Sequence, residues 1–305
     1  MSSILNKIKV PLPAGGRPPA AVEIAPEGVL AAAVPATGGA LTYAYAPLPA
    51  GAVTPRLEGV NLQAQDAVAG AIRSALDQVA PRKRAIALVL PDALVRVFML
   101  DFDSLPAKAA EAIPVLRFRL RKMVPFDVEH AAISYQILSE SKDECHVLAA
   151  VIPGPVLAEY EGAVRAAGYE PGAVLPSSLA ALETMDDMEA VLAAHLSSHT
   201  LTTTITNGQD LLLYRAMDLP ENPAERVGEI QRGIAVAAAY FEDKLQVRPR
   251  HLYYAGNEAI EEFAGWVGDP EMTMVALAPP PESGVLTPLG AANMAGVNGA
   301  LAGAR

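Results

Sequence analysis

Residues 114–138, PVLRFRLRKMVPFDVEHAAISYQIL, carry the pattern that decides the fold. Pro125 has no amide proton and disfavours helical backbone at Val124, so a helix that enters this stretch is expected to end there. Apolar residues then alternate with polar ones over 133–137, which predicts a strand. The stretch therefore predicts a helix, a sharp turn around Pro125 and a strand, with Phe126 anchoring the turn on a hydrophobic core.

Composition and charge exclude several classes of protein. The 305 residues are 51% hydrophobic, enough for two lobes that each have a core. A formal charge of −11 argues against nucleic-acid binding, because phosphate neutralisation needs a basic face. Cys145 is the single cysteine, which excludes internal disulfides and cysteine-based zinc sites. The best apolar run in an expected helix, 233–241, is about half of the roughly 20 residues that a membrane span needs, so we expect a cytoplasmic protein.

Strands and helices alternate along the whole chain, in two halves of similar order. After an extended arm over 1–20, the first half predicts strands over 22–24, 29–34, 41–45, 85–90, 94–100, 133–137 and 145–152, with helices over 61–79 and before Pro125. In the second half, Pro155 opens a helix that Gly168 closes. A hairpin turns at Asn207-Gly208, a helix runs over 224–245, and a strand ends at Gly256 before a short helix near 288–303. This order is typical of an α/β protein with two lobes.

Several segments in this order resemble the PilM family, actin-like cytoplasmic proteins of type IV pilus assembly, and their relative, the cytoplasmic part of GspL in type II secretion. The helix-Val-Pro-Phe-acidic-strand junction resembles theirs. So do EYEGAVRAAGYEPGAVLPSSLAAL at 159–182, the hairpin TTTITNGQDLLLYRAM at 202–217, the helix EIQRGIAVAAAYF at 229–241 and LYYAGNEAIEEF at 252–263.

The resemblance implies an actin-like (ribonuclease H-like) duplication of two lobes with a small inserted α/β subdomain. The first lobe would comprise 1–90 and 154–185, with the inserted subdomain at 91–153. The second lobe would comprise 186–277, and a C-terminal segment over 278–305 would return to the first lobe.

Proteins of this fold bind ATP and Mg²⁺ between two hairpin loops, and here both loops have lost the expected residues. In the first loop Glu23 keeps a carboxylate, but Ala25 replaces a glycine; Gly28 follows in the turn. The second loop, which would include Ser198 and Thr200, has no acidic residue between Glu189 and Asp210. At the adenosine turn, Gly256 and Asn257 follow an alanine instead of a second glycine. We therefore expect no catalytic residues, no metal and no bound cofactor, with Mg-ATP as the alternative.

The function that the resemblance implies is that of a non-catalytic adaptor on the cytoplasmic side of an inner-membrane pilus or secretion platform. Its partner would be a PilN-like membrane protein whose cytoplasmic N-terminal peptide enters a groove between the first lobe and the inserted subdomain. The partner-binding residues would be Arg117, Arg119, Arg121 and Phe126. The basic cluster could equally dock an acidic partner or anionic lipid, or be ordinary solvated surface. The alternative function is an active ATPase or kinase-like enzyme of the same fold, using Glu23 with Glu27.

Two further patterns suggest chemistry that the sequence does not support. His195 and His199 have the i, i+4 spacing of a metal-binding helix, but no glutamate follows His195 as the common zinc motif requires, so we assign both to the surface or a loop. The Ser177-Ser178 and Ser197-Ser198 pairs lack the G-x-S-x-G context of a hydrolase.

Overall fold

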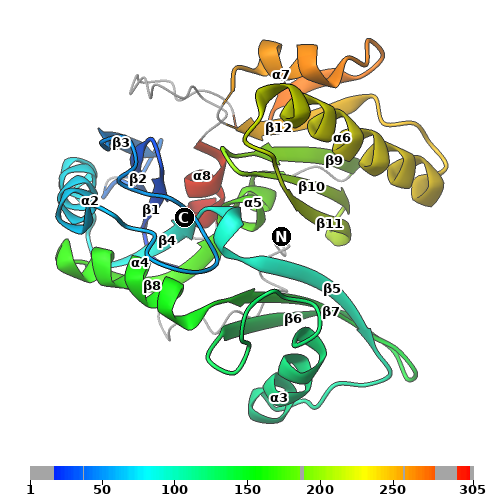
Figure 1. Cartoon of the computed structure of the whole chain (residues 1–305), viewed down its shortest axis with the longest axis horizontal. Helices are drawn as coiled ribbons and strands as arrows, with labels where there is room; N and C mark the ends of the chain where they lie inside the picture. The colour runs from blue at the N-terminus through cyan, green and yellow to red at the C-terminus, as the bar shows by residue number, and fades with distance from the viewer. Residues whose placement is uncertain (1–16, 37, 186–188, 257, 279–293, 303–305) are drawn as a thin grey trace.

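A computed structural model describes residues 17–36, 38–185, 189–256, 258–278 and 294–302. Within these residues the strands form two five-stranded sheets, with orders β3-β2-β1-β4-β8 and β11-β10-β9-β12-β13, and a three-stranded sheet, β5-β7-β6. The two large sheets have the same strand order. Each begins with three consecutive antiparallel strands, and the first of these strands also pairs in parallel with the next strand of the sheet, β4 or β12. This repeat is the duplication predicted from the sequence, and the small sheet is the inserted subdomain (Figure 1).

The first lobe is built on strands whose two faces are covered by different helices. Its strands are β1 (Ala20–Ala25), β2 (Gly28–Ala33), β3 (Thr42–Pro47), β4 (Ala85–Leu90) and β8 (Glu170–Pro176). One face packs against α2 (Gln65–Val79) and α4 (Gly154–Ala166), the other against α5 (Ser177–Ala181), η2 (Leu182–Thr184) and α8 (Ala295–Ala302). Both faces can be covered because successive side chains of a strand point to opposite faces of the sheet. In β1, Val22 and Ile24 pack in the core that contains α2, whereas Ala21 packs in the core that contains α8.

The second lobe repeats this plan with a longer helix. Its strands are β9 (Ala190–Leu196), β10 (Thr200–Asn207), β11 (Asp210–Asp218), β12 (His251–Gly256) and β13 (Thr273–Ala276), covered by α6 (Pro223–Leu245) and α7 (Ile260–Val267). The helix predicted over 224–245 is confirmed as α6, and its residues Ile230, Ile234, Ala237 and Phe241 form an apolar stripe that is buried against the sheet. The predicted hairpin at Asn207-Gly208 is also confirmed, and Gly208 has the positive φ of 58° that the turn requires.

The inserted subdomain follows η1 (Asp92–Leu94) and consists of β5 (Arg96–Phe102), α3 (Ala109–Leu120), β6 (Ala132–Glu140) and β7 (Cys145–Ile152). Leu116 and Leu120 of α3 pack with Val147 and Val151 of β7, so the helix covers one face of the sheet. The opposite face carries Leu148, which belongs to the core of the first lobe.

The helix before Pro125 ends earlier than the sequence predicts. α3 stops at Leu120, and Met123 N donates to Leu120 O in a tight turn. The reversal lets Val124 and Phe126 pack against the α3 core, which a helix continued to Val124 would prevent. The end of the helix is thus set by packing as well as by proline. Within the described residues, no helix is long and apolar enough to cross a membrane. Of the arm expected over 1–20, residues 1–16 lie outside the described residues, and Ala20 already begins β1.

Candidate functional site

Three parallel strands bring side chains from distant parts of the first lobe to one edge of its sheet. β1 and β8 each pair in parallel with β4, so the carboxyl ends of the three strands lie together. Glu23 lies near the end of β1, Asp92 follows β4 after Pro91, and Ser177 follows β8 as the first residue of α5. Ser177 Oγ donates a 2.6 Å hydrogen bond to Glu23 Oε1.

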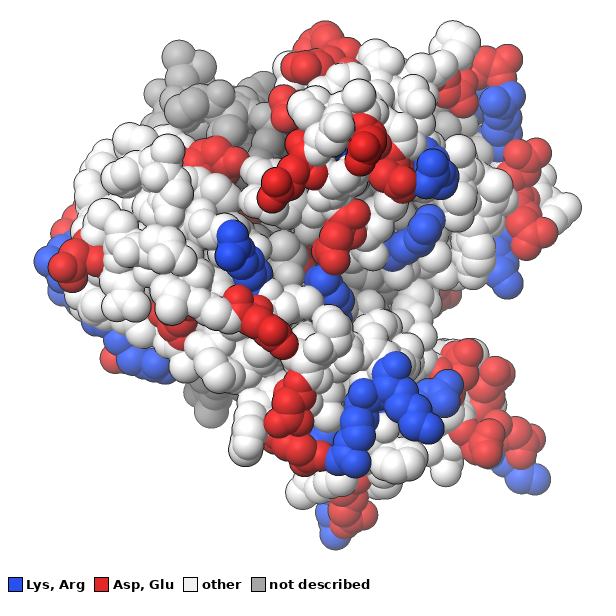
Figure 2. Space-filling model, in the orientation of Figure 1, with Lys and Arg blue, Asp and Glu red and all other residues white. Residues whose placement is uncertain are grey.

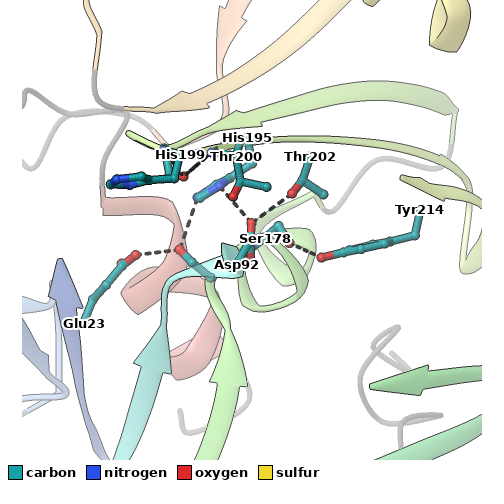
Figure 3. Close-up of polar contacts among 10 residues, drawn as sticks. Glu23, Asp92, Ser178, His195, His199, Thr200, Thr202 and Tyr214 are labelled. Atoms are coloured by element: carbon teal, nitrogen blue, oxygen red, sulfur yellow. Dashed lines mark hydrogen bonds and ion pairs between the residues drawn. The ribbon is translucent and has the colours of Figure 1, made fainter. Parts of the chain in front are cut away.

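His195, on β9 of the second lobe, joins this group from the other side (Figure 3). Its Nε2 lies 3.1 Å from Ser177 Oγ, and its Nδ1 lies 3.3 Å from Asp92 Oδ2. Because Ser177 donates its hydroxyl proton to Glu23, its oxygen accepts from Nε2–H. The second ring nitrogen lies at ion-pair distance from a carboxylate, so the arrangement suits a charged imidazolium. The assignment of His195 to the surface or a loop is therefore wrong: it is on a strand, with 14% of its side chain exposed.

Further hydrogen bonds extend this contact between the lobes. Asp92 also accepts from Thr202 Oγ1 at 3.1 Å and from the Ser178 amide at 3.1 Å. Ser198 Oγ, in the β9–β10 turn, donates to Glu27 Oε1 in the β1–β2 turn at 2.7 Å. The two hairpin turns that would face a phosphate chain from opposite sides are thus bonded to each other.

Burial and mutual charge shift the pKa values of these groups in different directions. Burial raises the pKa of Glu23 to about 7, although the Ser177 hydrogen bond and the charge of His195 oppose the rise. For Asp92, burial acts in the same direction, but the hydrogen bond and charge of His195 outweigh it and hold its pKa below the ordinary value. Burial lowers the pKa of His195, but the hydrogen bond and the charge of Asp92 raise it by more, so the pKa lies above its ordinary value. The shifts of His195 and Asp92 both favour an ion pair between them, and the Glu23 beside them is partly protonated near neutral pH.

The pocket that the described residues form around Glu23 and His195 is too small for a nucleotide. The pocket lined by Glu23, Glu27, Asp92, His195 and the β9–β10 turn has a cavity volume of about 30 Å³. That is room for about one water molecule. On the α8 side the site is closed as well, because a Cβ added at Gly296 would lie 2.6 Å from both Glu23 Oε2 and Ser177 Oγ. At this point the described side chains of Glu23, Ser177 and His195 contact one another.

Ser177, His195 and Asp92 have the connectivity of a Ser-His-Asp triad, which the sequence analysis did not anticipate. The arrangement cannot activate the serine in this state, because the Ser177 proton goes to Glu23 and an imidazolium has no free base. Ser177 is also only 1% exposed. The geometry fits a structural connection between lobes and not a nucleophile.

Of the residues predicted for the degenerate nucleotide site, Glu23, Ala25 and Ser198 line one pocket. Gly28 does not line this pocket. A glycine is needed at this position because a Cβ would clash with the hydroxyl of Tyr45. Tyr45 Oη donates to Glu27 O at 2.8 Å, so the ring shapes the β1–β2 turn.

Thr200 and Gly256, which were also predicted for the nucleotide site, do not line this pocket. Thr200 begins β10 and is buried, with its amide donating to Ser197 Oγ at 3.1 Å. Gly256 ends β12, where a Cβ would lie 2.8 Å from Leu196 O, so it permits close approach to β9. Asn257 lies outside the described residues.

The residues predicted for partner binding lie in different surroundings. Arg117 donates to the carbonyls of Val128 and Ala131 and so holds the turn after α3. Arg121 pairs with Glu129, and Phe126 is half-buried against the α3 core. Arg119 is exposed. The structure thus uses Arg117 internally and leaves Arg119 facing solvent.

Sequence reasoning missed Asp92 and the role of His195. A signal for Asp92 was present, since an acidic residue two positions after the end of a buried strand is placed at the edge where ligands bind in α/β sheets. His195 carried no such signal, because its partners are far away in the sequence. Among the residues that the structure describes, no three His, Cys, Asp or Glu side chains form a metal-binding group.

Comparisons with known proteins identify the fold. No family model and no curated protein matches the sequence. Among solved structures, a chain of the PilM-PilN type IV pilus biogenesis complex is similar, with 16% identity, a TM-score of 0.64, and coverage of 85% of this chain and 88% of that chain. The cytoplasmic domain of EpsL, an inner-membrane component of the Vibrio cholerae type II secretion system, is also similar. It has 14% identity and a TM-score of 0.52, and the match covers 92% of this chain and 94% of that chain.

A Bacteroides thetaiotaomicron protein with an actin-like ATPase fold and unknown function matches at 9% identity and a TM-score of 0.51, covering 84% of this chain and 90% of that chain. The chain therefore has the actin-like ATPase fold, as the sequence predicted.

Proposed function

We propose that this actin-like protein is a non-catalytic adaptor of a type IV pilus or type II secretion assembly platform at the inner membrane. The observation that carries the proposal is the filled position between the lobes, where the Glu23–Ser177–His195–Asp92 network leaves about 30 Å³. If the nucleotide position is occupied by the protein's own side chains, the actin-like fold can still act through its surfaces, which bind other proteins. The likeness to the PilM-PilN complex and to the EpsL cytoplasmic domain supports the choice of system.

The partner in this proposal is a PilN-like inner-membrane protein, bound through its cytoplasmic N-terminal peptide between the first lobe and the inserted subdomain. Two features of β6 support this location. Within the described strands, β6 pairs only with β7, so its outer edge has main-chain groups to offer an extended peptide. Gln136 lies opposite Leu148, on the sheet face that joins the first-lobe core. It is 3% exposed, and its Oε1 has no hydrogen-bond partner among the described residues.

A direct binding measurement tests the proposal. The peptide is the cytoplasmic N-terminal segment of a PilN-like protein from the same genome, titrated into the full chain by fluorescence anisotropy, with a scrambled peptide as the control. Saturable binding of the native segment alone is expected. Equal binding of the two peptides, or of neither, would contradict the assignment of this partner.

The second candidate function is an active ATPase or kinase-like enzyme. The observation that favours it is that carboxylates of Glu23, Glu27 and Asp92 all line the pocket. Nucleotide binding would need the Ser198–Glu27 and Ser177–His195 contacts to break and the lobes to move apart. The test compares thermal unfolding of the protein with and without Mg-ATP.

A further inference from the structure

The outer surface of α3 and the turn after it expose apolar side chains to solvent. Phe118 is 75% exposed, Met123 41% and Val115 38%. The opposite side of the helix, Ala112, Leu116 and Leu120, is buried against the small sheet. Single exposed apolar residues are ordinary, but three that lie within nine positions of one helix and its end form a patch. We call the group Val115, Phe118, Arg119, Lys122 and Met123 the α3 outer surface.

Cationic side chains flank this apolar group. Arg119 and Lys122 are exposed, and neither forms an ion pair or hydrogen bond within the described residues. Residues 108–130 carry five Lys and Arg against three Asp and Glu, in a chain whose formal charge is −11. Figure 2 shows Lys and Arg side chains gathered over the inserted subdomain, in the lower part of the view where Figure 1 places α3. The charge of this surface is thus opposite to that of the protein as a whole.

We propose that the α3 outer surface binds the surface of an anionic lipid bilayer. Phe118, with Val115 and Met123 beside it, enters the boundary between headgroups and acyl chains, while Arg119 and Lys122 contact the lipid phosphates. An exposed apolar group flanked by cations is the arrangement of interfacial helices. α3 lies on the outside of the three-stranded sheet, away from both lobes, so a flat membrane can reach it (Figure 1).

The charge distribution fixes the orientation of the bound protein. An anionic membrane repels an acidic protein except at its basic surface, so the α3 outer surface is the part that approaches. Two cations and one aromatic ring give weak binding by themselves, since stable anchoring takes two signals. A membrane-anchored partner would supply the second signal, but the lipid contact does not depend on the identity of that partner.

Vesicle co-sedimentation of the full chain, with no partner peptide present, tests this inference. Vesicles of phosphatidylcholine alone are compared with vesicles containing one third phosphatidylglycerol, at millimolar lipid and two salt concentrations. Wild type is compared with R119E/K122E and with F118S. Matched controls are K83E/R250E, which changes the net charge equally at exposed positions elsewhere, and V247S, which removes an apolar side chain that is 56% exposed.

The wild-type protein is expected to sediment with anionic vesicles only, and less at the higher salt concentration. R119E/K122E should lower the partition coefficient by roughly 30-fold or more, and F118S by about tenfold. The two controls should bind like wild type. The inference would be overturned if wild type did not bind anionic vesicles. It would also be overturned if the controls K83E/R250E and V247S lost as much vesicle binding as R119E/K122E and F118S. Loss of native-peptide binding in R119E/K122E, without vesicle binding by wild type, would assign this surface to a protein partner instead.

Discussion

His195 Nδ1 lies 3.3 Å from Asp92 Oδ2, so a cation of the second lobe is paired with a carboxylate of the first. The Asp92 side chain is 2% exposed, so loss of its partner would leave a buried carboxylate without its compensating charge. It also follows the strand β4 that leads into the inserted subdomain. One buried ion pair therefore lies where both lobes and the insert meet.

Replacement of His195 should destabilise the protein because it leaves Asp92 buried and unpaired. We expect His195→Ala to lower the free energy of unfolding by about 3 kcal/mol, measured by urea denaturation at neutral pH. His199→Ala, in the turn lining the same pocket, is the control and should change stability little. Adding Asp92→Asn should show coupling of about 1–3 kcal/mol with His195→Ala. Simple additivity of the two changes would exclude the ion pair as the cause.

Stability should fall as the pH rises from about 5 to 7.5. The folded-state pKa of Glu23 is raised from 4.5 to about 7, so between these values the folded protein holds a proton that the unfolded chain has lost. The raised pKa of His195 acts in the same direction above 6.5. The Asp92 contribution has the opposite sign, because its lowered pKa gives stability that is lost only in stronger acid. Urea unfolding at intervals across pH 5–8 measures the slope.

Glu23→Gln removes the group that contributes most to this slope. The variant should therefore gain stability relative to wild type as pH rises from 5 to 7.5, by on the order of 2 kcal/mol. Glu225→Gln, on the exposed start of α6, serves as the control. Parallel profiles for wild type and Glu23→Gln would show that Glu23 does not titrate in this range.

The strands and hairpins could be predicted from local sequence, whereas the site could not. Asn207-Gly208 specifies its turn by backbone preference alone, and the α6 stripe follows from helical spacing. Ser177, His195 and Asp92 meet only because two sheets with the same order face each other across the lobes. Each residue has an ordinary local explanation as a cap, strand or turn residue. The alanines at positions where the family has glycines predicted a degenerate nucleotide site, but not which side chains would meet there.

Mg-ATP should neither bind nor be hydrolysed. A cavity of about 30 Å³ cannot hold a triphosphate, so binding requires breaking the contacts between the lobes. A nucleotide at 100 times its dissociation constant would add roughly 2.7 kcal/mol of stability, which thermal unfolding readily detects. We expect no shift with Mg-ATP and no phosphate release above background. ATP turnover that disappears in Glu23→Gln would instead support the enzyme alternative.

Phe126 should contribute to the stability of the inserted subdomain, but less than a fully buried ring. It is half-buried against the α3 core, so Phe126→Ala should cost about 2 kcal/mol, compared with about 3 kcal/mol for Leu116→Ala, which is fully buried. Phe118→Ala, at 75% exposure, should cost under about 0.5 kcal/mol. Denaturant unfolding of the three variants gives the order. Equal losses for the two phenylalanines would show that the turn is not anchored by Phe126.

Gln136 should show opposite effects on stability and on partner binding. Its Oε1 is buried without a hydrogen-bond partner in the described part of the chain, which costs free energy in the unbound protein. Gln136→Leu, of similar volume, should therefore raise the free energy of unfolding by about 1 kcal/mol. If the partner peptide supplies the missing donor, the same change should weaken peptide binding several-fold in the anisotropy measurement. Ser139→Ala, at an exposed position of β6, should change neither quantity. A variant that gains stability and binds the peptide as tightly as wild type would place the peptide away from Gln136.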